Sequence, residues 1–210
     1  MPLQNRVTPF SGIEAVPYRG LFMGNRGVLH DERKQLLTQG WRHRAWIICE
    51  LNYQDRRRAL MQPRRYTELF FPDEAVALAA GHRPCAWCRR SAFRDFVSAW
   101  SSVTGAPAVA SALDAGLHPE RVARLRGQVR WTSEVGALPT GTFTVDPGLP
   151  GQAWLKWDDR MLLWSRSGYV RAERWPDSQS VEILTPPTSL HALRAGYRPV
   201  LHPSGTDLLR

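Results

Sequence analysis

The sequence predicts an α+β protein in two parts: a small metal-binding lobe of short strands and two helices, then a β-rich part forming a barrel-like or curled sheet. Three observations support this prediction. A Cys-x-x-Cys pair at Cys85 and Cys88 follows a short helical pattern. Residues 104–112 are small, uncharged and interrupted by Gly and Pro, as linkers are. After residue 138, short aromatic or β-branched segments alternate with turn sequences. The expected boundaries are 1–103 for the lobe with an inserted basic hairpin, 104–127 for a linker and short helix, and 128–210 for the β-rich part.

The composition is that of a folded protein. Hydrophobic residues make up 43% of the 210 residues and charged residues 22%, which is unlike a disordered chain. No run approaches the roughly 18 apolar residues of a membrane helix, so no membrane partner is expected. The N-terminus lacks the basic start and apolar core of a signal peptide, and a cytoplasmic location is expected. The odd count of three cysteines argues against a disulfide framework and favours metal ligands.

The charge of the chain points to an acidic partner. The formal net charge is +9, and such a balance is typical of proteins that contact nucleic acid. The excess is concentrated in residues 1–105, with 16 Lys or Arg against 9 Asp or Glu. Nearly all cations are arginine, whose planar guanidinium suits phosphate. The alternative is a merely basic surface, because a GC-rich genome also replaces Lys by Arg.

The first part reads as strands joined by turns and a basic loop. Two short apolar runs in residues 19–31 flank Gly24 and Asn25, which predicts a hairpin turning there. Residues 41–53 alternate and then become apolar, as a buried strand does. Residues 54–65 form a basic loop, and residues 66–71 form another strand.

Helix signals follow. The segment "EAVALAA" begins after Pro72 and Asp73 and is closed by Gly81. Ser91 is expected to cap a second helix, whose apolar stripe is Phe93, Phe96, Val97 and Trp100. Residues 119–126 begin with Pro at a first helical position and predict a short helix.

The second part consists of five expected strands with turns built on Pro-Gly, Asp-Asp-Arg and Ser-Gly. They span residues 140–145, 153–157, 161–164, 168–172 and 180–184. Beyond them, "ALRAGYRP" (192–199) repeats "ALAAGHRP" (77–84), with Pro187 aligned to Pro72. A chance helix-stop pattern and a degenerate duplication both explain this repeat.

The Cys-x-x-Cys pair has two chemical readings. Two thiolates about one helical turn apart can reach one tetrahedral Zn²⁺ at roughly 2.3 Å, and Arg83, Arg89 and Arg90 would favour the thiolate forms. A redox pair normally lies between a strand and the N-terminus of a helix. Here a helix precedes the cysteines, which favours the metal.

At these residues a family resemblance becomes visible. "DEAVALAAGHRPCAWCRR" (73–90) resembles the second half of the metal-binding domain of the Ada DNA-repair methyltransferase, a module also found at the ends of some bacterial nucleases. "GNRGVLH" (24–30) is similar to the first half. The resemblance covers about residues 20–92 and implies a zinc site and a role with DNA. It places His30 at the first ligand position and Cys85 and Cys88 at the last two.

The departures from the family pattern set the expected ligands. The second ligand position falls on Lys34, which cannot bind metal while protonated. More residues separate Lys34 from the segment "DEAVALAA" than the family pattern has, which indicates an inserted hairpin, and Cys49 on that hairpin is the natural replacement. The expected set is therefore His30, Cys49, Cys85 and Cys88. Cys49 could instead be a small core residue and His30 an exposed loop residue, with His43 or His82 as substitute ligands. A histidine in the first position does not support methyl transfer by the family's route, and four protein ligands describe a structural zinc.

Cations and aromatic residues interleave around the inserted hairpin, where cations can follow phosphate and aromatic faces can stack on bases. The alternative is a solvated face above core aromatics. The candidate nucleic-acid-binding residues are Trp41, Arg42, Arg44, Arg56, Arg57, Arg58, Arg64 and Arg65.

Together these features predict a zinc-stabilised nucleic-acid-binding protein, with DNA favoured over RNA, that acts in repair or processing. One alternative is a nuclease or base-processing enzyme with its active site between the lobes, for which Glu50, Glu68 and His43 are the residues to probe. The other is a non-catalytic module that grips a ligand or protein with Trp154, Trp157, Trp164 and Trp175.

Overall fold

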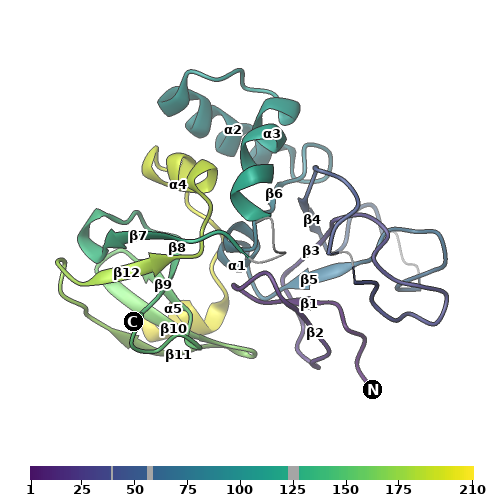
Figure 1. Cartoon of the computed structure of the whole chain (residues 1–210), viewed down its shortest axis with the longest axis horizontal. Coiled ribbons are helices and arrows are strands. Elements are labelled where there is room, and N and C mark those ends of the chain that lie inside the picture. Colours follow the sequence, from purple (N-terminus) through teal and green to yellow (C-terminus); the bar gives the residue numbers. More distant parts are fainter. Residues whose placement is uncertain (39, 56–58, 123–127) are drawn as a thin grey trace.

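The computed structural model describes residues 1–38, 40–55, 59–122 and 128–210. In these residues the chain forms two six-stranded sheets, five α-helices and one short 3-10 helix (Figure 1). The mixture of helices and sheets confirms the α+β class. No helix in the described ranges is both long and apolar enough to span a bilayer.

The first sheet is mixed and has the order β2-β1-β5-β3-β4-β6. Its strands β1 and β5 pair in parallel, as do β4 and β6, and the other pairs are antiparallel. The strands are β1 (Arg6–Val7), β2 (Ile13–Glu14), β3 (Phe22–Asn25), β4 (Ile47–Glu50), β5 (Leu69–Phe71) and β6 (Arg83–Pro84).

The expected hairpin turn at Gly24 and Asn25 is wrong, because both residues lie inside β3. Gly24 pairs with Ile48 on one side and with Leu69 on the other. A Cβ added to Gly24 would collide with the Ile47 carbonyl and would lie 2.9 Å from the Phe71 ring. This glycine therefore permits a close approach of strands rather than a turn.

Three helices lie after β5 in the chain, the first of them before β6. Helix α1 (Glu74–Ala79) begins at Asp73, whose Oδ1 accepts a hydrogen bond from the Val76 amide at 2.9 Å, and Gly81 follows it with a φ of +81°. Helix α2 (Arg90–Thr104) has Arg89 at its N-cap, without a side-chain hydrogen bond. The expectation that Ser91 caps this helix is therefore wrong, because Ser91 lies inside its first turn.

Helix α3 (Ala110–Arg121) begins at the end of the expected linker 104–112 and contains Pro119 in its interior. Five of the eight residues of the segment "ASALDAGL" are Ala or Leu, which have high helix propensity. The expected helix over 119–126 is thus the end of α3, and residues 123–127 lie outside the described ranges.

The second sheet is antiparallel and open, with the order β11-β10-β9-β8-β12-β7. Each of the five expected segments contains a strand, and β7 was not expected. Strands β7 and β11 are the two edges and do not pair among the described residues, so the barrel-like alternative is wrong. The strands are β7 (Trp131–Glu134), β8 (Thr142–Val145), β9 (Trp154–Trp157), β10 (Arg160–Ser165), β11 (Gly168–Glu173) and β12 (Ser180–Ile183).

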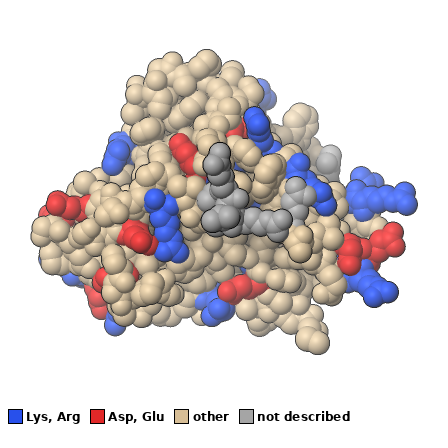
Figure 2. All heavy atoms as spheres, in the orientation of Figure 1, with Lys and Arg blue, Asp and Glu red and all other residues tan. Residues whose placement is uncertain are grey.

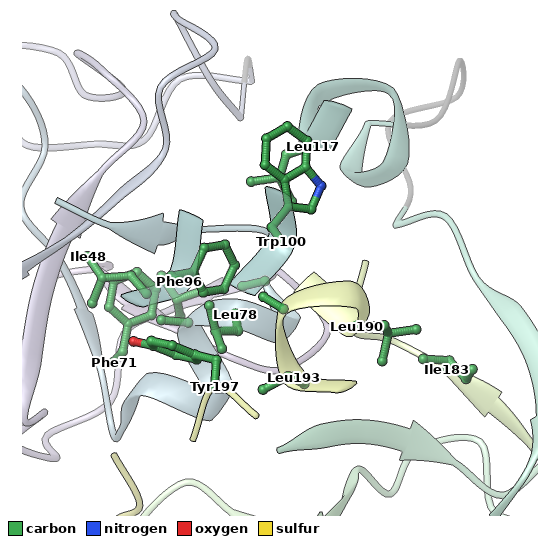
Figure 3. Packing of buried hydrophobic residues seen from close by; sticks show 14 of the residues in the cluster. Ile48, Phe71, Leu78, Phe96, Trp100, Leu117, Ile183, Leu190, Leu193 and Tyr197 are labelled. Carbon is green, nitrogen blue, oxygen red and sulfur yellow. The ribbon is translucent and has the colours of Figure 1, made fainter. Parts of the chain in front are cut away.

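One hydrophobic cluster joins the two sheets through helices. The 3-10 helix (Val135–Ala137) follows β7, and α4 (Pro187–Arg194) and α5 (Pro203–Leu208) follow β12. Helix α2 packs against α4. Figure 3 shows Phe71, Leu78 and Phe96 of the first half close to Tyr197 and Leu193 of the second, in the same cluster. The Phe96 and Tyr197 rings meet edge to face with centroids 5.0 Å apart.

Candidate metal centre

The three cysteines are brought together by the pairing of β4 with β6. Ile48 pairs with Pro84, and the Cys85 amide donates to the Ile48 carbonyl at 2.9 Å. This register places Cys49, the residue after Ile48, beside Cys85. Cys88 follows in the turn that leads into α2. The three sulfur atoms lie within 4.8 Å of one another and could hold a metal ion.

The spacing of these sulfurs suits a tetrahedral site. Metal–sulfur bonds of roughly 2.3 Å place the sulfurs of such a site about 3.8 Å apart, so small side-chain rotations suffice. The thiols also share protons. Hydrogen bonds from the Cys49 and Cys88 thiols lower the pKa of Cys85, whereas donation by Cys49 raises the pKa of that thiol. A metal ion bound by the sulfurs would favour the thiolate form of all three.

The neighbouring arginines contribute less positive charge than the sequence suggested. The Arg83 guanidinium donates to both carboxylate oxygens of Asp114, at 2.9 and 2.7 Å. Arg89 is paired with Glu74 at 2.7 Å and with Glu50 at 3.2 Å. Only Arg90 is exposed. Two of the three arginines are therefore neutralised by carboxylates rather than directed at the thiolates.

His30 does not lie with the sulfurs, although the resemblance placed it first among the ligands. It is buried, its Nδ1 lies 2.6 Å from Thr67 Oγ1, and its Nε2 lies 3.2 Å from the Gln62 carbonyl oxygen. A carbonyl oxygen only accepts, so Nε2 carries a proton, and Nδ1 is engaged by the hydroxyl. Both ring nitrogens are thus committed to this segment of the chain, and the group of possible metal ligands holds Cys49, Cys85 and Cys88 without His30.

The two substitute histidines are also held elsewhere. His43 Nε2 lies 3.2 Å from the Asn25 side-chain oxygen, and the buried His82 accepts from Arg26 Nε at 3.2 Å. Burial lowers the pKa of both rings. Among the described residues, no His, Cys, Asp or Glu besides the three cysteines places a ligand atom within 4.8 Å of all three sulfurs. The residues outside the described ranges include none of these four types.

All three cysteines line a pocket of about 480 Å³. This volume lies within the ~300–1,000 Å³ typical of small-molecule sites. The same wall includes two carboxylates, Glu50 and Glu68. Four aromatic side chains complete much of the lining, namely Tyr53, Tyr66, Phe70 and Trp87.

The two pocket carboxylates differ in burial. Glu68 precedes β5, is buried, and its Oε2 accepts a hydrogen bond from the Met61 amide at 2.8 Å. The Glu50 side chain is 44% exposed and is paired with Arg89. Glu68 is therefore a fixed group in the pocket wall, and Glu50 lies nearer to solvent.

Trp87 is a pocket residue that the sequence did not single out. It lies between the two cysteines of the Cys-x-x-Cys pair and is 73% exposed. The residues between the two cysteines belong to a turn, where a large aromatic side chain can remain exposed. That position was the signal that could have identified it.

The expected nucleic-acid-binding residues lie at the surface where they are described. Arg42, Arg44, Arg64 and Arg65 are exposed, and Arg56, Arg57 and Arg58 fall outside the described residues. Trp41 is half-buried, with its ring edge-on to His118 at a centroid distance of 4.5 Å. Figure 2 shows one face of the molecule, on which Lys and Arg side chains lie scattered among neutral and acidic ones rather than joined in one band.

Several of the described arginine side chains are buried rather than exposed. Arg26, Arg83, Arg89 and Arg121 are buried. The guanidinium groups of Arg26 and Arg121 lie 4.2 and 4.3 Å from the Trp46 ring centroid. Burial lowers the pKa of both to about 9. These four residues support the fold and do not form a surface for phosphate.

Comparison with known proteins adds no relative. No family model, no curated protein and no solved structure matches the chain. The site is therefore interpreted from its own residues and geometry.

Proposed function

We propose that this chain is a zinc protein that binds nucleic acid, with Zn²⁺ held by Cys49, Cys85 and Cys88. The convergence of the three sulfurs is the observation that carries the proposal. Thiolates favour zinc and iron–sulfur clusters over harder ions. A third sulfur beside the Cys-x-x-Cys pair favours a metal site over a two-cysteine redox pair.

The number of protein ligands changes the kind of zinc site that we propose. Structural zinc sites have four protein ligands, whereas sites with three leave a position for water or another ligand. The three cysteines line a pocket, and His30 is bonded elsewhere. A site with an accessible fourth position fits these facts better than the closed site expected from the sequence.

Nucleic acid is the partner that the charge supports. The net charge is +9, and exposed cations lie next in sequence to residues that line the pocket. Tyr53 and Tyr66 line the pocket, while Arg64 and Arg65 are exposed beside Tyr66 in sequence. Phosphates could be held by these arginines while a base approaches the aromatic side chains. DNA is the nucleic acid that the resemblance favours.

Elemental analysis of the purified protein tests the metal. One zinc ion per chain is expected, and Cys49→Ser or Cys88→Ser should lower this content because each removes one of three ligands. His30→Ala is the matched control and should retain zinc, since both its ring nitrogens are bonded elsewhere. Full zinc content in Cys49→Ser would show that the ligand set is wrong.

Binding of single-stranded and duplex DNA at several salt concentrations tests the partner. Affinity should fall steeply with salt, with a slope of about −0.7 per neutralised phosphate on single strands. The double variant Arg64→Ala, Arg65→Ala should reduce this slope by about 1 to 2. Its charge-matched control is Arg194→Ala, Arg210→Ala, two exposed arginines in the second half. Absent binding at low salt would refute this half of the proposal.

A base-processing enzyme is a second candidate, favoured by the pocket that joins the cysteines to Glu68. A zinc ion with three protein ligands can bind water, and a neighbouring carboxylate can accept the proton of that water. Turnover of labelled oligonucleotides by wild type but not by Glu68→Gln, at equal zinc content, would support this activity. Equal turnover in both would exclude Glu68 as the base.

A further inference from the structure

Any metal held by the three sulfurs borders the pocket, because all three cysteines line it. A tetrahedral ion bound to three thiolates needs one more ligand. Among the described residues no further His, Cys, Asp or Glu joins the group. The fourth ligand would therefore be a molecule in the pocket. The charge of the pocket and the side chains that line it determine which kind of molecule can bind there.

The charge of the pocket opposes anions. Zn²⁺ with three thiolates carries one net negative charge, and Glu50 and Glu68 add two more when ionised. Among the described residues, none that lines the pocket is Lys, Arg or His. Arg89 contacts Glu50, but it is also paired with the buried Glu74. A phosphate would enter against this field, whereas an uncharged or cationic group would not.

The aromatic side chains favour a flat ligand. Tyr53, Tyr66 and Phe70 line the pocket, and Trp87 offers an exposed face between two of the cysteines. Aromatic faces stack on planar rings of any base and attract cations. Ring nitrogens of the imidazole type are good donors to zinc. One class of molecule meets both conditions, namely planar nitrogen heterocycles.

We infer that the pocket binds an uncharged or cationic nitrogen heterocycle of the nucleobase class. A ring nitrogen of this ligand takes the fourth coordination position of the metal, and Trp87 stacks on its face. This inference rests on the zinc site proposed above. It also divides the nucleic-acid contacts of the protein: exposed arginines hold phosphates, and the pocket holds a base and excludes phosphate.

Cobalt substitution tests this directly, because Co²⁺ replaces Zn²⁺ in thiolate sites and its ligand-field absorption reports the fourth ligand. The full chain loaded with Co²⁺ is titrated with imidazole, adenine and cytosine, and separately with inorganic phosphate. At least one heterocycle should change the ligand-field bands in a saturable way. Phosphate at the same concentrations should leave them unchanged.

Trp87 supplies the matched variants. Trp87→Ala should weaken heterocycle binding by at least about fivefold, the effect of losing a modest base-stacking contact. The cobalt spectrum without added heterocycle should stay as in wild type, which shows that the sulfurs are undisturbed. Trp87→Tyr keeps an aromatic face and should restore most of the affinity.

The outcomes are distinguishable. Absence of thiolate-to-cobalt charge-transfer bands would overturn both the metal site and this inference. Normal charge-transfer bands with ligand-field bands that no heterocycle alters would leave the metal site standing and overturn the inference. Bands altered by phosphate as readily as by heterocycles would overturn the ligand class. Equal affinity in Trp87→Ala and wild type would remove the stacking role.

Discussion

Asp73 is a buried carboxyl group that links the stability of the fold to pH. Its oxygens accept hydrogen bonds from the Val76 amide at 2.9 Å, the Tyr169 hydroxyl at 2.8 Å and the His202 amide at 3.1 Å. Burial raises its pKa from 3.8 to about 6, although these hydrogen bonds oppose the shift. The same residue caps α1 and binds the second half of the chain.

The raised pKa of Asp73 predicts the direction in which stability changes with pH. Between pH 3.8 and about 6 the folded protein retains a proton on Asp73 that the unfolded chain has released. The contribution of Asp73 to the free energy of unfolding therefore falls by about 3 kcal/mol at most as pH rises through this window. Above the window this contribution is constant. Urea unfolding at several pH values measures the change.

Asp73→Asn is the comparison variant for this prediction. It should be less stable at every pH, because an amide cannot accept hydrogen bonds at both of its ends. The variant should lack the decrease in the free energy of unfolding that Asp73 causes in the wild type. The difference in stability between the two proteins should therefore narrow as pH rises from 3.8 to about 6. A constant difference across that window would show that Asp73 keeps its ordinary pKa.

The cysteines show how far single residues can be predicted. Cys85 and Cys88 follow from their spacing alone, since two residues between thiols place both within reach of one ion. Cys49 was expected as the replacement for Lys34 in the pattern of the resemblance, and the pairing of β4 with β6 brings it beside Cys85 although the two are distant in sequence. His30 was placed by spacing borrowed from a resemblance, and the structure instead bonds its ring to Thr67 and Gln62. Two possible ligands that are close in sequence can be predicted from their spacing. Whether a distant residue joins them depends on how the chain between them folds.

At the scale of the element, β3 depends on one glycine. Gly24 lies between β4 and β5, where an added Cβ would meet the Ile47 carbonyl and the Phe71 ring. Gly24→Ala should lower the free energy of unfolding by about 1 to 3 kcal/mol, the usual cost of overpacking. Thermal unfolding followed by circular dichroism measures it.

The control for this prediction is Gly151→Ala, because a Cβ at Gly151 would meet no atom within 4 Å. Its melting temperature should match wild type or rise slightly, since Ala restricts the unfolded chain. If Gly24→Ala melted as late as Gly151→Ala, the close approach of β3 to its neighbours would be wrong.

The elements of the second sheet were the easiest to predict. Strands β8 to β12 are short, aromatic or β-branched and separated by strong turn signals, all of which are local properties. Whether their sheet closes depends on pairing between β7 and β11, which no local pattern records. The first residues of α3, 110–112, were taken for linker because small residues suit both, and the helix is recognised only from the packing of Leu113 and Leu117 into the core.

At the scale of the whole molecule, the two sheets are joined by shared packing and by buried polar contacts. Leu78 and Phe96 belong to the same hydrophobic cluster as Ile183 and Tyr197. Glu74 accepts hydrogen bonds from Arg89 at 2.7 Å, the Tyr197 hydroxyl at 2.6 Å and the Val200 amide at 3.0 Å. Neither half can keep these groups buried and bonded without the other.

This sharing predicts a single cooperative unfolding transition. Far-ultraviolet circular dichroism and tryptophan fluorescence should give the same midpoint in denaturant. Tyr197→Phe should shift both probes together, by about 1 to 3 kcal/mol, because it leaves the buried Glu74 carboxylate one donor short. Two separated transitions, or a shift of one probe alone, would show independent halves.

The position of the cysteines also has a topological consequence. A metal ion bound by Cys49 and Cys85 is a cross-link that closes the intervening stretch of chain into a loop. By the loop-closure argument used for disulfides, such a link can remove unfolded-state entropy equivalent to roughly 4 kcal/mol. The enclosed chain contains residues 51–66, with the exposed Arg64 and Arg65. Removing such a metal ion should therefore lower the free energy of unfolding, because Cys49 in β4 and Cys85 after β6 would lose the link that joins them across a long stretch of sequence.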